Sequence, residues 1–330
     1  MIIISFFTKI LHYLPGELSH FIALGGLKFL YYSRLIKLFQ FAKKYDFTER
    51  DIRHRKDMLG IAAGLDKNGE YIDSLASLGI GFIEVGTVTP KPQTGNPKPR
   101  IFRNKKEKSL LNRLGFNNKG VDYLVEKLKK RQSKVIVGSS IGKNFDTPND
   151  KAYEDYVYCL EKVYEFSDYI AVNVSSPNTK DLRKLSSKDF FDSLLKKLKD
   201  SHSELSIKFG YKPIFIKISP DETPDSLALI CKSIVSNKMD GIICSNTTVN
   251  HYEKFGSGGL SGAPLKIKSN KILTFVRDEV GKDFPIIASG GVMSVEDYQE
   301  KIQLGADLVQ IYTGFIYEGP KLIQDINKYS

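Results

Sequence analysis

Eight apolar runs recur along the chain, and each ends in small or polar residues such as Gly, Asn, Ser, Thr or Lys. The runs span residues 58–67, 82–87, 135–144, 169–176, 214–219, 241–247, 285–291 and 308–313. Amphipathic stretches with helical spacing lie between them, at 120–131, 190–200, 225–236 and 295–305. This alternation of buried strands and helices predicts βαβ units and a parallel sheet.

The number of units distinguishes two parallel architectures. Eight strand–helix units over about 270 residues fit a (β/α)8 TIM barrel, which commonly has about 250 residues. A doubly wound open sheet is the alternative. The polar clusters of this chain fall at the carboxyl ends of the predicted strands, where such barrels carry their chemistry. We therefore expect one barrel over residues 46–330, with the functional residues on that face.

Residues 1–45 have no strand pattern and form a separate segment. Apolar residues recur at helical spacing from Ile3 to Leu14, Pro15 interrupts them, and a second apolar face follows. Basic residues dominate the segment, whose only acid is Glu17. No run approaches the ~20 apolar residues that span a bilayer, and no signal peptide is expected. The pattern suits helices lying in a membrane interface, and equally a cap on the barrel or a dimer contact.

Composition narrows the class of protein further. With 330 residues, 41% of them hydrophobic, the chain can bury a sizeable core. Cys159, Cys231 and Cys244 are far apart, so neither a disulfide framework nor a zinc site is expected, and no metal is predicted. The net charge of +11 is scattered over helix faces without an aromatic-interleaved basic motif. It favours anionic substrates or a membrane surface, and no nucleic-acid partner is expected.

Two features at the strand ends indicate an anionic ligand. Gly290 and Gly291 follow the seventh strand, and residues 312–313 follow the eighth. In TIM barrels these two loops commonly bind phosphate through backbone N–H groups. Lys217 lies inside an apolar strand, where a lysine is rare unless it is paired or functional. Lys67 ends the first run, and on its own it could equally be an exposed loop lysine.

Amide side chains gather at or near the same strand ends. They are Asn112, Asn117, Asn144, Asn173, Asn178 and Asn246. An abundance of amides with few histidines or carboxylates indicates recognition of a planar, hydrogen-bonding molecule rather than hydrolysis. The sequence has neither the spacing of a Ser/His/Asp triad nor a Walker A motif.

Seven motifs in this order resemble the dihydroorotate dehydrogenase family. They are residues 62–69, 84–90, 96–103, 112–118, 173–179, 258–262 and 308–315, and the resemblance extends from about Glu17 to Pro320. The N-terminal segment, Arg103 and Ser176 resemble the membrane-bound, quinone-dependent class (class 2), because the soluble class carries cysteine in place of this serine.

The resemblance implies an FMN flavoprotein that oxidises dihydroorotate to orotate in pyrimidine biosynthesis and passes electrons to a membrane quinone. Ser176 would take a proton from C5 of the substrate while hydride leaves C6 for the flavin. Lys67 would pair with the substrate carboxylate. The remaining substrate-binding residues implied are Asn112, Arg113, Leu114, Gly115, Phe116, Asn173, Asn178, Asn246 and Thr247.

The family pattern also implies cofactor and quinone contacts. For FMN these are Ala63, Gly64, Leu65, Asp66, Lys67, Thr87, Ser140, Asn173, Lys217, Ser245, Gly262, Gly291, Tyr312 and Thr313. For the quinone tunnel they are His20, Arg103 and Tyr312. Two positions depart from the family, because Ser140 replaces a usual Asn and Ser245 a frequent Thr. The implied location is peripheral, on the cytoplasmic face of the bacterial inner membrane.

Two other functions would have different sequence features. The soluble class, which reduces fumarate or NAD, would be expected with cysteine at position 176 and without the N-terminal segment. A non-catalytic scaffold at a membrane surface would need none of Lys67, Ser176 and Lys217. Both are disfavoured by the sequence.

Overall fold

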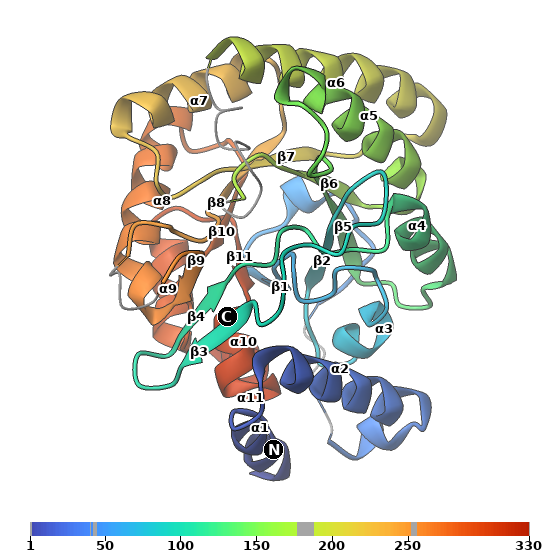
Figure 1. The fold of residues 1–330 in the computed structure, drawn as a ribbon, viewed down its shortest axis with the longest axis vertical. Coiled ribbons are helices and arrows are strands. Elements are labelled where there is room, and N and C mark those ends of the chain that lie inside the picture. Colours follow the sequence, from blue (N-terminus) through green and yellow to red (C-terminus); the bar gives the residue numbers. More distant parts are fainter. Residues whose placement is uncertain (1, 40, 42–44, 177–187, 252–255, 330) are drawn as a thin grey trace.

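The computed structural model describes residues 2–39, 41, 45–176, 188–251 and 256–329. Eight short parallel strands form its centre: β1 (Met58–Ile61), β2 (Phe82–Val88), β5 (Ile136–Ile141), β6 (Tyr169–Asn173), β7 (Ile214–Lys217), β8 (Gly241–Cys244), β10 (Ile286–Ser289) and β11 (Leu308–Ile311). They close into a barrel in the order β1, β11, β10, β8, β7, β6, β5, β2 (Figure 1). The (β/α)8 TIM barrel is confirmed, and the open doubly wound sheet is excluded.

Helices cover the outside of the barrel. They are α3 (Ile72–Ala76), α4 (Val121–Lys130), α5 (Ala152–Val163), α6 (Lys188–Phe209), α7 (Pro224–Ser236), α8 (Lys266–Val280), α9 (Val295–Gln303), α10 (Thr313–Glu318) and α11 (Pro320–Tyr329). The predicted helices at 120–131, 225–236 and 295–305 correspond closely to α4, α7 and α9. Helix α6 extends beyond the predicted 190–200, because Leu205 and Phe209 continue its apolar face against the core.

A second sheet, which the sequence pattern did not predict, lies outside the barrel. Its antiparallel strands are β3 (Ile101–Asn104), β4 (Ser109–Asn112) and β9 (Gly259–Gly262), in that order. The register pairs Asn112 with Gly259 and Ser109 with Gly262. The sheet thus joins the chain that follows β2 to the chain that follows β8, two regions far apart in sequence.

Residues 50–56 lie under the opposite, N-terminal end of the barrel and carry three cations at a spacing of three residues. The ion pairs, here called the basal clasp, are Arg50–Asp168 (2.6 Å), Arg53–Asp240 (3.1 Å) and Lys56–Asp307. Each aspartate directly precedes a strand and also accepts a backbone N–H at 2.8 Å, from Val137, Ile214 and Ile286 respectively. Ile52 is fully buried in the same segment, which therefore closes this end of the barrel.

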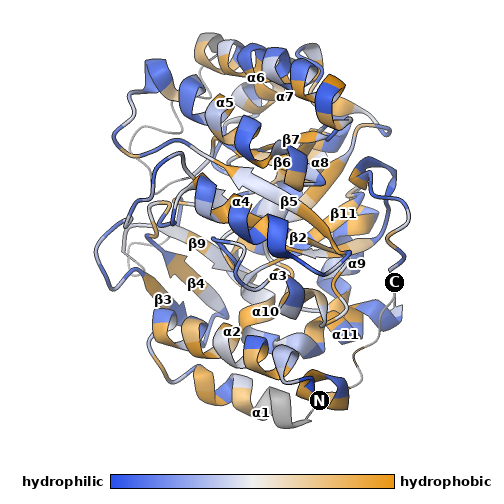
Figure 2. Cartoon of the chain, turned by 90° about the vertical axis from the view of Figure 1, so that its right-hand side faces the viewer, coloured by the Kyte–Doolittle hydropathy of each residue, from blue (hydrophilic) through white to orange (hydrophobic). Residues whose placement is uncertain are grey.

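The N-terminal segment is helical, as predicted. Helices α1 (Ile2–Leu11) and α2 (Gly16–Tyr32) and the 3-10 turn η1 (Leu35–Phe39) lie beside the barrel, where α1 contacts α10 and α11 and α2 contacts α3 and β3 (Figure 1). Both helices carry hydrophobic residues along their length (Figure 2). Large apolar side chains exposed in this segment are Phe7, Ile10, Tyr13, Leu18, Phe21, Ile22, Phe29, Tyr32, Leu35 and Leu38. Among the described residues, no helix is both long and apolar enough to cross a membrane.

Candidate functional site

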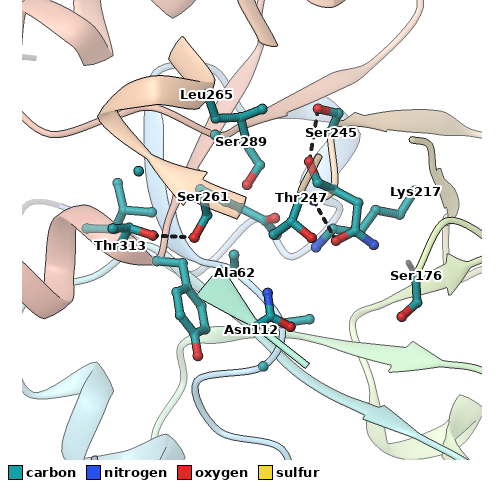
Figure 3. Close-up of a pocket in the computed structure, with 18 of the residues that line it drawn as sticks. Ala62, Asn112, Ser176, Lys217, Ser245, Thr247, Ser261, Leu265, Ser289 and Thr313 are labelled. Carbon is teal, nitrogen blue, oxygen red and sulfur yellow. Dashed lines mark hydrogen bonds between the residues drawn. The ribbon is translucent and has the colours of Figure 1, made fainter. Parts of the chain in front are cut away.

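A cleft with about 940 Å³ of open space lies at the C-terminal ends of the barrel strands. Its wall combines residues that follow the barrel strands with residues of β4 and β9. The cleft is elongated in Figure 3, where Thr313 and Ser261 lie at one end and Lys217 and Ser176 at the other. The second sheet therefore completes a site that the barrel alone would leave open.

Most of the implied site residues line this cleft. Those that do are Ala63, Gly64, Lys67, Thr87, Asn112, Leu114, Gly115, Phe116, Asn173, Ser176, Lys217, Ser245, Asn246, Thr247, Gly262, Gly291, Tyr312 and Thr313. They come from nine separate stretches of the chain, which the closure of the barrel brings together.

The charge of the cleft is positive. Its described lining residues include Lys67 and Lys217 and no acidic side chain. Burial lowers the pKa of Lys67 to about 7, and nearby Arg100 lowers it too, while Glu17 opposes them. A cleft of this charge suits a ligand that carries carboxylate or phosphate groups.

Amides and hydroxyls form a connected network at the Lys217 end. Asn173 donates through Nδ2 to Thr87 Oγ1 at 2.9 Å, and Asn246 donates through Nδ2 to Asn173 Oδ1 at 3.3 Å. Asn246 also donates to Ser175 Oγ at 3.1 Å. On the opposite wall, Asn112 donates to the carbonyl of Gly259 at 3.0 Å. These bonds fix the amide planes before a ligand arrives.

Ser176 is held close to this network, three residues after β6 ends. Its side chain lies on the Lys217 side of the cleft (Figure 3), and the residue is only 6% exposed. A hydroxyl in a largely dry pocket can exchange a proton with a bound molecule without competition from bulk water.

The far end of the cleft is made of glycines and hydroxyls. Gly290 and Gly291 follow β10 with φ of +105° and +79°, in the left-handed region. Thr313 begins α10, and its Oγ1 lies 2.8 Å from Ser261 Oγ. Backbone and hydroxyl donors that line a cleft in this way are suited to a phosphate group.

Four implied residues lie behind the wall rather than on it. Ser140 is fully buried, and its Oγ lies 2.9 Å from Thr87 Oγ1, so the replacement of Asn by Ser leaves it contacting a lining residue. Asp66 accepts two backbone N–H groups of the following turn, and burial raises its pKa to about 6. Leu65 is buried beside it, and Arg113 turns outward to the carbonyl of Ser257. Asn178 lies outside the described residues.

Other lining residues did not emerge from the sequence. They include Ala62, Leu265, Val292, Met293, Gln310 and Ile311. Glu84, directly beneath the cleft, accepts a hydrogen bond from Lys217 Nζ at 3.2 Å. The signal for Glu84 in the sequence is a single carboxylate inside the apolar run 82–87.

The N-terminal segment adjoins the cleft. Burial, followed by the charge of Lys67, lowers the pKa of His20 to about 4, which indicates that α2 lies close to the site. Arg103 of β3 donates to the carbonyl of Leu11 and to Ser19 Oγ, at 3.1 and 3.2 Å. It thereby holds the turn between α1 and α2, beside a groove formed by residues 12–17 and 98–105.

Comparison with known proteins identifies the family. A family model described as Dihydroorotate dehydrogenase matches residues 53–329. The chain belongs to the dihydroorotate dehydrogenase family. Similar curated proteins carry the name Dihydroorotate dehydrogenase (quinone): one from Vibrio atlanticus is 50% identical over 83% of each chain. Another, from Buchnera aphidicola, is 49% identical over 81% of this chain and 82% of the relative.

Solved dihydroorotate dehydrogenase structures share the fold. The enzyme of Eimeria tenella in complex with ferulenol has a TM-score of 0.81 at 33% identity, and the match covers 94% of this chain and 89% of that one. The resemblance inferred from the seven motifs is thus confirmed. The names of the curated relatives also confirm the quinone-dependent class as the part of the family to which the chain is similar.

Proposed function

We propose that this protein is a quinone-dependent dihydroorotate dehydrogenase, which oxidises dihydroorotate to orotate in pyrimidine biosynthesis with FMN as its cofactor. The observation that carries the proposal is the cleft itself. In a chain half identical to named quinone-dependent enzymes, it brings Lys67, Ser176 and Lys217 together at the C-terminal face of the barrel. A scaffold protein would have no use for this combination.

The cleft fits an elongated anionic cofactor. Its described lining has cations but no acids, and Gln310 contributes a buried Oε1 without a hydrogen-bond partner. Gly64 leaves space beside the ring of Tyr312, since a Cβ there would meet it at 3.3 Å. The flavin ring would lie toward Lys217, and its phosphate toward Gly291 and Thr313. Bound FMN would supply the acceptor for the hydride.

The chain's own groups would prepare the substrate. The ammonium group of Lys67 would bind the carboxylate of dihydroorotate, and the amides of Asn112, Asn173 and Asn246 would bind the ring edges. Ser176 Oγ would accept the proton from C5 as hydride leaves C6. A serine hydroxyl is a weak base, so its burial among hydrogen-bonding groups is what would make it effective.

Residues 1–45 would form the quinone and membrane segment. The support is the set of exposed apolar side chains on α1 and α2, together with basic side chains and the influence of Lys67, a cleft residue, on His20 of α2. Quinone would pass His20 and Arg103 toward Tyr312. We propose peripheral attachment to the cytoplasmic face of the bacterial inner membrane, with the barrel (46–330) in the cytoplasm.

Separating the two half-reactions tests this function. Purified protein should show flavin absorbance that dihydroorotate bleaches anaerobically and a long-chain quinone restores. Ser176→Ala should retain FMN and lose about 10²-fold or more in the bleaching rate. Arg103→Ala should bleach normally and reoxidise slowly with quinone, while a small water-soluble dye still reoxidises it at the full rate.

Three results would contradict the proposal. They are full-length protein that binds no flavin, Ser176→Ala within about tenfold of the parent rate, and Arg103→Ala with undisturbed quinone reoxidation. The first concerns the cofactor, the second the base and the third the N-terminal segment, so each part fails separately.

A further inference from the structure

Glu84 is a carboxylate in the middle of the buried strand β2 and is fully inaccessible to solvent. Both its oxygens are occupied. Oε1 accepts from Lys217 Nζ at 3.2 Å, and Oε2 accepts from Gln310 Nε2 at 2.7 Å and from Tyr169 Oη at 3.3 Å. The four side chains come from four different barrel strands and meet in the interior. No function assigned so far uses Glu84.

The arrangement has two levels. Lys217 and Gln310 line the cleft, whereas Glu84 and Tyr169 lie behind them. Glu84 therefore does not line the cleft, but it accepts hydrogen bonds from two residues that do. Because Gln310 donates its amide to Glu84, the orientation of the unpartnered Oε1 of Gln310 is fixed by the same carboxylate.

Such a pair is costly to bury. The charges of Lys217 and Glu84, whose side chains are 6% and 0% exposed, have both lost their hydration. Burial of an ammonium group is tolerable only with a counter-ion and hydrogen bonds, and removal of one partner leaves an uncompensated charge. The surrounding barrel strands are filled with Ile, Val and Phe, which would stabilise a core at lower cost. The network is thus better explained by the cleft than by stability.

We propose that Glu84 is the positioning residue that, as counter-ion, holds the ammonium group of Lys217 in place and directed at the flavin ring, so that the site favours reduced over oxidised flavin. The inference rests on the proposed function, because it requires FMN in the cleft. Reduction adds negative charge to the ring, and a fixed cation nearby stabilises the reduced form more than the oxidised one. Without Glu84 the ammonium group would lose the partner that holds it in place and would move away from the ring, and that preference would fall.

The test is the midpoint potential of bound FMN, measured by reductive titration against reference dyes in excess FMN. Glu84→Gln keeps the size of the side chain and one of its two accepting oxygens but removes the charge. We expect it to lower the preference for reduced over oxidised FMN by about tenfold, which for a two-electron couple is about 30 mV. Lys217→Met should have at least this effect, and adding Glu84→Gln to it should change nothing further, because Glu84 acts through Lys217.

Asp307→Asn is the matched control. It too converts a buried, ion-paired carboxylate to an amide, but at the opposite end of the barrel, where Arg277 donates to it at 2.9 Å. Its flavin potential should equal that of the parent protein even if it unfolds more easily. A general loss of stability is thereby distinguished from a change at the flavin.

An unchanged or raised midpoint potential in Glu84→Gln overturns the inference. A raised potential would mean that the carboxylate acts only by repelling the negative charge of the reduced flavin, because its removal would then favour reduction. If that variant is isolated without flavin, Glu84→Asp replaces it: the shorter side chain lengthens the 3.2 Å contact, and a shift in the same direction is expected. No shift there also overturns the inference. A parent protein that binds no FMN would instead refute the proposed function.

Discussion

Lys67 should make ligand binding depend on pH near neutrality. Burial lowers its pKa to about 7, with a further contribution from Arg100. Only the ammonium form pairs with a carboxylate, so binding of orotate draws a proton onto Lys67. The affinity is therefore fully present well below pH 7 and declines as the pH rises through 7.

The size of the effect follows from that value. With a pKa of about 7, the charged fraction of Lys67 falls from about 90% at pH 6 to about 10% at pH 8. The dissociation constant of orotate should then rise about tenfold over this interval. The carboxylate of orotate remains ionised throughout, and His20, whose pKa is lowered to about 4, stays neutral.

Titration of the flavin absorbance with orotate at pH 6, 7 and 8 measures this. Orotate is preferable to the substrate because it does not reduce the flavin. Glu17→Gln is the informative companion, because Glu17 raises the pKa of Lys67 and its loss should move the profile to lower pH. This reasoning would be refuted if the affinity for orotate did not change between pH 6 and pH 8. It would also be refuted if the pH profile of Glu17→Gln moved to higher pH.

Two further predictions concern the framework of the site. Gly291→Ala should weaken FMN binding about tenfold or more, measured by fluorescence titration, because its Cβ would lie 2.3 Å from Lys266 Cα at a φ of +79°. Gly25→Ala in α2, where nothing lies within 4 Å, should instead leave FMN binding unchanged, and weakening there as well would discredit the steric argument. Arg53→Ala should lower the free energy of unfolding in urea by about 1–3 kcal/mol, because Asp240 loses a charge-assisted partner. A loss below about 0.5 kcal/mol, typical of exposed pairs, would show that this pair does not hold the barrel base.

The sequence predicted the barrel well because its strands are buried on both faces. Such strands form apolar runs that end abruptly in polar residues; seven of the eight predicted runs contain a barrel strand, and β2 extends one residue beyond the remaining run. The length of helix α6 was underestimated because its last turns are less apolar than its first turns.

The sheet β3–β4–β9 escaped prediction for a physical reason. Each strand has four residues, β9 is half glycine, and the partner of β4 lies about 150 residues further along the chain. Neither periodicity nor local composition encodes such a pairing. Since β4 and β9 carry Asn112 and Gly262, one wall of the cleft could be assigned only from the family resemblance.

The hydrogen-bond partners in the polar network of the barrel interior could not be predicted from the sequence. Lys217 stood out because a lysine in an apolar strand is rare, but its partner Glu84 lies 133 residues away. Ser140 was implied as a flavin contact, and its hydroxyl lies beside that of Thr87, a residue that lines the cleft. Motifs predict which residues gather at a site more reliably than which of them form its surface.

The basal clasp has a consequence for how the chain folds. Its three pairs span 118, 187 and 251 residues, and they engage β6, β8 and β11, which are alternate strands around the barrel. The ion pairs of this short segment can therefore form only when β6, β8 and β11 are each in place. Contacts this distant in sequence close large loops and form slowly. A growing chain that ends before residue 307 leaves Lys56 without its aspartate, so barrel closure is completed only by the last strand.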